Sequence, residues 1–181
     1  GFYRHEVYIN EARMLGAIIE PPDIQHSEPL TSLKQDVIYL GLNQVISLSK
    51  KMIKSIPDER MNNGAYKDLI SFLERTAISY DEVTNLIYVG AFRSFKKAKG
   101  HLIIEAKKYF NHTDKKKVKN ELFDIAPKSF KFPEIEEDKL ADAFDELEGL
   151  GYPVSISPFN LLNTTFRGDV LVKDLLNHVN K

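Results

Sequence analysis

The sequence predicts a mainly α-helical protein with at most one short β element. From Leu42 onward, hydrophobic residues recur at helical spacing in almost every segment that glycine or proline does not interrupt. Only one run, DVIYLGL at residues 36–42, is short, apolar and β-branched in the way that strands are. The chain has 181 residues, 43% of them hydrophobic, which is enough for one sizeable core or two small ones.

The first helix is expected in HEVYINEARMLGA, where Tyr8, Ala12 and Leu15 are at helical spacing and Gly16 is a plausible stop. The next stretch, EPPDIQHSEPL, holds three prolines and is expected to be an extended connector, because proline lacks the backbone donor that a helix needs. The expected strand at residues 36–42 follows. It leads into YLGLNQVISLSKKMIKSI, which has the pattern of an amphipathic turn, a tight hairpin and a second helix.

The remaining helices are predicted from hydrophobic periodicity. One contains Leu69, Phe72 and Leu73; the next contains Val83, Leu86, Ile87 and Val89 and ends at Gly90; a third runs from about Ser94 to Tyr109. Past Phe110 the periodicity fails in a lysine-rich stretch with two prolines, which is expected to be a surface linker. A helix with Leu140, Phe144 and Leu147 turned inward and closed by Gly149 or Gly151 comes next, and then a last helix, capped by Asp169, with the apolar stripe Val172, Leu175, Leu176 and Val179.

The composition limits the classes of function. The net charge is −1, so contact with nucleic acid would have to be local, because a protein held to DNA by its whole surface would be basic. There is no cysteine, which excludes disulfides and thiolate metal sites. No apolar run approaches the ~20 residues of a membrane helix, so no membrane partner is expected. The chain opens on Gly-Phe-Tyr-Arg-His-Glu, almost directly in a helical pattern and without an initiator methionine, which indicates a piece cut from a longer protein.

A search for catalytic or metal-binding residues finds none. No two aspartates are two positions apart, the five histidines are scattered without ligand spacing, and no Gly-rich phosphate loop or Ser/His/Asp elbow is present. Asp142 and Asp145 share a helix face and have the pattern of an ordinary solvated surface. We therefore expect no catalytic residue, no metal site and no cofactor in this chain.

The charges are unevenly distributed along the chain. Residues 93–120 contain ten Lys/Arg and two Asp/Glu, whereas residues 121–148 contain ten Asp/Glu and three lysines. One interpretation is two solvated surfaces that partly attract each other. The other is that the basic block binds a polyanion.

Several stretches together resemble one family, the bacterial replicative DNA polymerase III alpha subunit of the DnaE type. YINEARMLGAIIEPPDI is similar to the end of its fingers region, through Glu11, Ala12, Arg13, Leu15, Gly16, Pro21, Pro22, Asp23 and Ile24, with Ser27 at a position where the family often has serine. VIYLGLNQVISLSKKMIKSI falls at its helix-hairpin-helix segment, with Gly41 and Leu42 matching, and YKDLISFLERT resembles the helix that follows. LIYVGAFRSF carries a Gly-Ala-Phe-x-Ser signature at Gly90, Ala91, Phe92 and Ser94, and LEGLGYPVSISP matches through Leu150, Gly151, Tyr152, Ser155 and Pro158.

The resemblance implies that the chain is part of a DNA-directed DNA polymerase. The family's catalytic aspartates lie in an upstream palm region that acts with Mg²⁺, and an OB-fold domain lies downstream; this chain carries neither, so we expect it to be inactive alone. Four regions are implied: the end of the fingers and the Pro-rich connector (1–30), a helix-hairpin-helix domain (31–110), a linker with a clamp-binding peptide (111–133), and a helical run-up to the OB fold (134–181). The implied location is the bacterial cytoplasm, at the nucleoid.

The hairpin departs from the family at the residues that hold phosphate. The family typically has Ile-Lys-Gly-Val-Gly, and this chain has Val45, Ile46, Ser47, Leu48 and Ser49. Glycines let the backbone approach a phosphate closely, and their loss weakens that geometry. Ser49 can still cap a helix that begins at Lys50, and Lys50 and Lys51 can supply charge. Ser47, Ser49, Lys50 and Lys51 are therefore the candidate DNA-binding residues, and the alternative is that Val45, Ile46 and Leu48 pack a purely architectural hairpin.

A second candidate site lies in the expected linker. Leu122 and Phe123 are large apolar residues in polar surroundings, which indicates a groove in the same chain or a partner. The family has a short Gln-x-x-Leu-Phe peptide here that binds the sliding clamp, and Lys119 stands where glutamine is usual. Lys119, Leu122 and Phe123 are the candidate clamp-binding residues; the alternative is that Leu122 and Phe123 fold back onto the helices.

The resulting hypothesis is a fragment that helps to position duplex DNA and tethers its polymerase to the sliding clamp among other replisome subunits. The alternative is a helical protein-interaction scaffold that descends from this domain and no longer binds DNA. The substituted hairpin and the near-neutral net charge favour the scaffold. The basic block and the order of the family's motifs favour the DNA-binding hypothesis.

Overall fold

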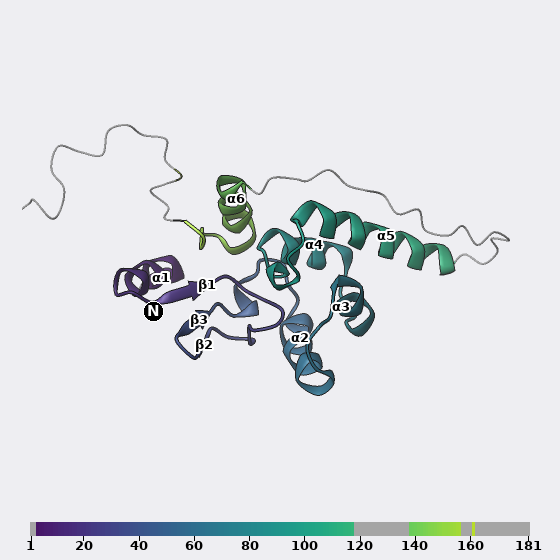
Figure 1. Ribbon diagram of the computed structural model, residues 1–181, viewed down its shortest axis with the longest axis horizontal. Coiled ribbons are helices and arrows are strands. Elements are labelled where there is room, and N and C mark those ends of the chain that lie inside the picture. Colours follow the sequence, from purple (N-terminus) through teal and green to yellow (C-terminus); the bar gives the residue numbers. More distant parts are fainter. Residues whose placement is uncertain (1–2, 118–137, 157–160, 162–181) are drawn as a thin grey trace, which may run out of the picture.

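The computed structural model describes residues 3–117, 138–156 and 161. Six α-helices, two 3-10 turns and three short strands are found in this part of the chain (Figure 1). In chain order they are α1 (His5–Met14), β1 (Ile18–Glu20), β2 (Ser32–Lys34), β3 (Val37–Tyr39), η1 (Leu42–Gln44), α2 (Lys50–Asn63), α3 (Leu69–Arg75), α4 (Tyr80–Tyr88), η2 (Arg93–Phe95), α5 (Lys99–Lys117) and α6 (Lys139–Leu150). The prediction of a mainly α-helical domain with one short β element is confirmed.

The β element is a three-stranded sheet rather than a single strand. The expected strand is found as β3, at the centre of the order β1-β3-β2, and it pairs parallel with β1 and antiparallel with β2. Gly41, directly after β3, is required by a close backbone approach, because a Cβ there would lie 2.5 Å from the carbonyl carbon of Leu30 and 2.6 Å from the nitrogen of Thr31.

The core forms between the sheet and helices α2 to α5. Phe72 lies at its centre, with its ring 5.0 Å from the ring of Tyr66 and 5.0 Å from the ring of Phe92. The largest fully buried side chains are Phe72, Phe92, Ile24, Leu42, Met52, Ile56, Leu69, Leu86, Ile87, Val83, Val89 and Val154. The periodicity predictions for α3 and α4 are confirmed, since their expected apolar residues all face this core.

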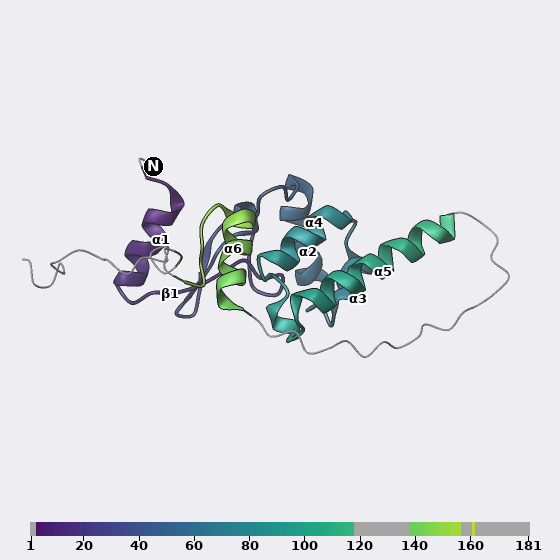
Figure 2. The same ribbon diagram turned by 90° about the horizontal axis from the view of Figure 1, so that it is seen from above.

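Helix α5 differs from its prediction at both ends. It begins at Lys99, after the separate turn η2, and continues to Lys117 instead of ending near Tyr109. Its C-terminal half projects away from the other helices in Figures 1 and 2. Because that half is polar, it carries no hydrophobic period from which the end of the helix could be recognised.

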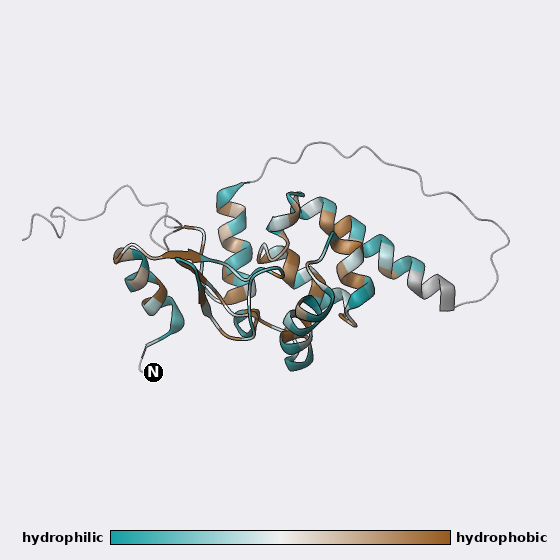
Figure 3. Ribbon diagram, turned by 60° about the horizontal axis from the view of Figure 1, so that its bottom comes forward, coloured by the Kyte–Doolittle hydropathy of each residue, from teal (hydrophilic) through white to brown (hydrophobic). Residues whose placement is uncertain are grey.

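Helix α6 turns the opposite face to the core from the one that we predicted. Leu140, Phe144 and Leu147 are 44%, 49% and 40% exposed, whereas Ala143, Glu146 and Leu150 are buried. The carboxylate of Glu146 accepts hydrogen bonds from the backbone N–H groups of Val154 (2.6 Å) and Ser155 (2.7 Å), which compensates for its burial. Figure 3 shows hydrophobic and hydrophilic segments alternating along α6. The predicted last helix lies outside the described residues.

Candidate nucleic-acid interface

The amphipathic turn, the hairpin and the second helix predicted from the sequence are all present. The 3-10 turn η1 enters the hairpin, residues 45–48 reverse the chain, and α2 leaves it. Val45 and Leu48 are buried, as an architectural hairpin requires, whereas Ile46 is 48% exposed. The alternative in which all three residues pack inward is therefore wrong for Ile46.

Ser47 takes the backbone conformation that glycine normally provides. Its φ is +65°, in the left-handed region, which costs a residue with a Cβ about 1–2 kcal/mol. The family resemblance places the first hairpin glycine at this position. The hairpin therefore keeps the glycine-type turn although the glycine is absent.

Ser49 is the N-cap of α2, as the sequence predicts. Its φ and ψ are −66° and 148°, and its Oγ accepts a hydrogen bond from the backbone N–H of Met52 at 3.3 Å. Lys50 and Lys51 form the first turn of the helix and are exposed. Two ammonium groups thus lie at the end of the helix where the dipole also favours an anion.

A second helix-turn-helix unit, formed by α3, residues 76–79 and α4, lies against the first. Ser79 caps α4 in a capping box with Glu82: the Ser79 Oγ accepts from the Glu82 backbone N–H, and the Glu82 carboxylate accepts from the Ser79 backbone N–H at 3.0 Å. The other oxygen of this carboxylate, Oε1, accepts from the backbone N–H of Ser49 at 3.0 Å. One side chain of α4 therefore binds the N-terminus of α2 as well as that of its own helix.

The Glu82 carboxylate is held in its charged form by these contacts. Partial burial acts to raise its pKa, but the hydrogen bonds from Ser79 and Ser49 outweigh burial and lower the pKa below its ordinary value. Glu82 lies on α4 and contacts the hairpin through Ser49, and the sequence analysis did not predict this contact. The pattern Ser79-x-x-Glu82 shows the capping box, but no local pattern shows the contact to Ser49, 33 positions earlier in the chain.

Two further hydrogen bonds join the hairpin to the end of α6 and the residues after it, and a third closes the hairpin itself. The backbone N–H of Ile46 donates to the carbonyl of Gly149 at the end of α6 (2.8 Å), and that of Leu48 donates to the carbonyl of Val45 (3.3 Å). Tyr152 follows α6, and its hydroxyl donates to the side-chain oxygen of Gln44 at 3.2 Å. The backbone N–H groups of Ile46, Leu48 and Ser49 are thus all bound within the chain.

Two of the motifs that carry the family resemblance contact each other. The Ile24 N–H donates to the carbonyl of Ala91 at 3.0 Å, and the Arg93 guanidinium donates to the carbonyls of Pro21 and Pro22, both at 2.9 Å. The proline-rich connector therefore lies side by side with the Gly-Ala-Phe segment. These residues have a structural role, since they hold the connector that follows β1 against the segment that follows α4.

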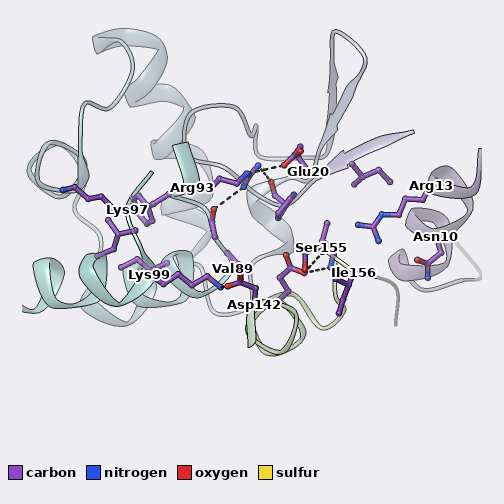
Figure 4. Close-up of a pocket in the computed structure, with 18 of the residues that line it drawn as sticks. Asn10, Arg13, Glu20, Val89, Arg93, Lys97, Lys99, Asp142, Ser155 and Ile156 are labelled. Atoms are coloured by element: carbon purple, nitrogen blue, oxygen red, sulfur yellow. Dashed lines mark hydrogen bonds and ion pairs between the residues drawn. The ribbon is translucent and has the colours of Figure 1, made fainter. Parts of the chain in front are cut away.

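A cavity of about 920 Å³ lies between α1, β1, the end of α4, the start of α5 and α6 (Figure 4). Several of its charged groups are paired within the chain. Arg93 lies 3.3 Å from Glu20, Lys97 lies 3.0 Å from Glu105, and Lys99 lies 2.6 Å from Asp142 and 2.8 Å from Asp145. Asp142 and Asp145 are consequently not the ordinary solvated surface that we predicted.

The remaining predicted residues can be placed only in part. Lys119, Leu122 and Phe123 lie outside the described residues, as does Pro158. Within the described ranges, no helix is long and apolar enough to cross a membrane. The same ranges contain no group of three or more His, Cys, Asp or Glu side chains that could hold a metal ion.

Comparison with known proteins gives the relatives of the chain. Residues 16–102, from the approach to β1 to the start of α5, match the family described as the helix-hairpin-helix motif. An error-prone DNA polymerase of Bdellovibrio bacteriovorus is 31% identical over 99 residues, which is 52% of this chain and 9% of that protein. The DNA polymerase III alpha subunit of Staphylococcus aureus is 30% identical over 155 residues, or 83% of this chain and 14% of that protein.

Over 83% of its length the chain is similar in sequence to DNA polymerase III alpha subunits. The alpha subunit of Staphylococcus epidermidis, 29% identical over the same length, also aligns with 83% of the chain. The chain spans less than a sixth of the length of each of these relatives. The matched residues include both units that meet at Glu82, so the hairpin before α2 lies within the stretch that matches the helix-hairpin-helix motif.

Proposed function

We propose that this chain is the part of a DNA polymerase III alpha subunit that supports duplex DNA beside the active site. The observation that carries the proposal is the hairpin within the matched region: it keeps the glycine-type turn at Ser47, the cap at Ser49 and two exposed lysines in the first turn of α2. Lysines at a helix N-terminus are suited to sequence-independent contact with phosphate. The intact polymerase would supply the palm and the Mg²⁺ ions, in the bacterial cytoplasm at the nucleoid.

Salt-titrated binding to a labelled duplex tests the DNA-binding function. The chain should bind at low salt and lose affinity steeply as salt rises, because phosphate contacts release counterions. The double substitution Lys50→Glu with Lys51→Glu should weaken binding by about tenfold and reduce the salt slope by about two phosphate contacts. Lys67→Glu with Lys139→Glu changes the net charge equally at exposed lysines outside the hairpin and is the matched control. If the two pairs weaken DNA binding equally, the hairpin is not the DNA-binding site.

Tethering to the sliding clamp is the second part of the proposal. The support is the sequence Lys119-Asn-Glu-Leu-Phe123, which matches the family's clamp peptide in its last four positions. Leu122→Ala with Phe123→Ala should abolish binding to the cognate clamp in calorimetry, because the two apolar side chains are the anchors of such a peptide. Lys119→Gln should strengthen binding by restoring the usual amide. Unchanged affinity in the double alanine variant would contradict the clamp assignment.

A helical protein-interaction scaffold that no longer touches DNA is the competing function. The hydrogen bond from Ser49 to Glu82 favours it, since this bond engages a backbone donor that phosphate would need. Absence of salt-dependent DNA binding by the chain would establish the scaffold in place of the DNA-binding function. In either case we expect no primer extension by the chain alone, because the proposed active site belongs to another part of the polymerase.

A further inference from the structure

Glu82 occupies an unusual position between the two helix-turn-helix units. Its Oε1 accepts from the Ser49 N–H at 3.0 Å, and its Oε2 accepts from the Ser79 N–H at 3.0 Å and from the Ser79 hydroxyl at 2.8 Å. A single carboxylate therefore bridges the N-termini of α2 and α4. Each terminus carries partial positive charge, so the bridging anion is favoured by both helix dipoles.

The contacts of this carboxylate are those that a phosphate oxygen would make at the same place. Phosphate binding at a helix N-terminus uses backbone N–H groups together with the dipole. The Ser49 N–H begins α2, and Glu82 already provides it with an anionic oxygen at hydrogen-bonding distance. A phosphate approaching this donor would also meet the negative charge of Glu82, which opposes its binding.

The acceptors of the hairpin differ in how readily they can be displaced. Ile46 and Leu48 donate to the backbone carbonyls of Gly149 and Val45, which are fixed by the fold. Ser49 donates to a side chain that is only partly buried and that can rotate away. Of these three donors, Ser49 is therefore the one that can exchange its partner without a change of backbone.

We propose that Glu82 is an internal competitor of DNA phosphate, and that the affinity of the α2 hairpin for duplex DNA is set by displacement of this carboxylate from Ser49. The inference rests on the proposed DNA-binding function and names the residue that limits it. Glu82 limits the affinity in this scheme: with the carboxylate in place the two units are held together, and with it displaced Ser49, Lys50 and Lys51 face one phosphate.

The test compares Glu82→Gln with Asp81→Asn in salt-titrated binding to the same duplex. Glutamine retains the capping box, so α4 keeps its N-terminal support while the negative charge next to the Ser49 N–H is lost. Glu82→Gln should bind about five- to tenfold more tightly than the unaltered chain, with a salt slope steeper by about one phosphate contact. Asp81→Asn makes the same change of net charge in the same turn, where no contact with Ser49 exists, and should gain less than twofold.

The possible outcomes distinguish failure of the Glu82 inference from failure of the proposed DNA-binding function. A gain in Glu82→Gln no larger than in Asp81→Asn overturns the inference, and if the unaltered chain binds DNA the proposed function stands. Absence of binding by all three proteins overturns both. A backbone amide spectrum gives a direct second readout, because the Ser49 amide signal should shift as Glu82 is titrated with acid and should not do so in Glu82→Gln. No acid-dependent shift in the unaltered chain would contradict the bridge.

Discussion

The Lys99 ammonium lies 2.6 Å from the carboxylate of Asp142. This contact joins the start of the basic block to the acidic block of the sequence, and Asp145 adds a second contact at 2.8 Å. Burial acts to lower the pKa of Lys99, but the hydrogen bonds to the two aspartates outweigh it and raise the pKa. The interpretation of the two blocks as mutually attracting surfaces is thus correct at this point, while Lys107 remains exposed.

Replacing Lys99 by methionine should loosen α6. Methionine keeps much of the apolar stem, but Asp142 and Asp145 would then repel each other without a cation between them. We expect a loss of about 1–2 kcal/mol in the free energy of unfolding, together with faster amide hydrogen exchange in α6. Lys107→Met, on an exposed part of α5, is the control and should change neither quantity. Unchanged exchange in α6 after the Lys99 substitution would show that packing alone holds this helix.

The sequence predicts an element well where its hydrophobic period and its caps agree. Helix α4 is the clear case, because Ser79 and Glu82 mark its start and its apolar residues face the core. The strands β1 and β2 have three residues each, and β2 reads Ser-Leu-Lys, so neither carries a periodic signal. They become strands only by pairing with β3, which is a tertiary effect.

In the candidate site, too, the local contacts could be predicted from the sequence and the long-range contacts could not. The cap at Ser49 depends on residues three positions apart and was predictable. Two other contacts depend on how segments that are distant in the sequence pack together. These are the hydrogen bond from Ser49 to Glu82 and the hydrogen bond from Val154 to the buried Glu146. The inward face of α6 was mispredicted for this reason: a buried glutamate has the pattern of a solvated residue until its backbone partners are known.

Substitutions of Ser47 should report the cost of its left-handed conformation. Ser47→Gly relieves strain of about 1–2 kcal/mol but increases the entropy of the unfolded chain, so the net gain in the free energy of unfolding should be at most about 1 kcal/mol. Ser47→Val should lose at least about 1 kcal/mol, since β-branched residues strongly disfavour positive φ. Urea unfolding measures both variants. Equal stability of the glycine and valine variants would contradict the turn geometry.

Two substitutions in α6 should distinguish its faces. Leu150→Ala removes a buried side chain and should lower the free energy of unfolding by about 2–3 kcal/mol. Phe144→Ala removes a larger side chain that is half exposed and should cost less than about 1 kcal/mol. Urea unfolding of the two variants gives the comparison. A greater cost at Phe144 than at Leu150 would mean that residues outside the described ranges cover the exposed face.

The bridge at Glu82 should make part of the stability dependent on acid. Because hydrogen bonding lowers the pKa of Glu82 in the folded chain, its contribution is complete above the ordinary pKa of 4.5 and is lost as the pH falls through the lower folded value. At pH 6 the unaltered chain should exceed Glu82→Gln by about 0.5–1 kcal/mol, a modest value because solvent screens a partly exposed carboxylate. Once the pH is below the folded pKa the difference should disappear, since the protonated carboxyl and the amide are then both neutral. Urea midpoints of the two proteins at several pH values measure this, and the other carboxylates cancel in the comparison. A difference that stays constant from pH 6 to pH 3 would show that the charge of Glu82 does not hold the two helix-turn-helix units together.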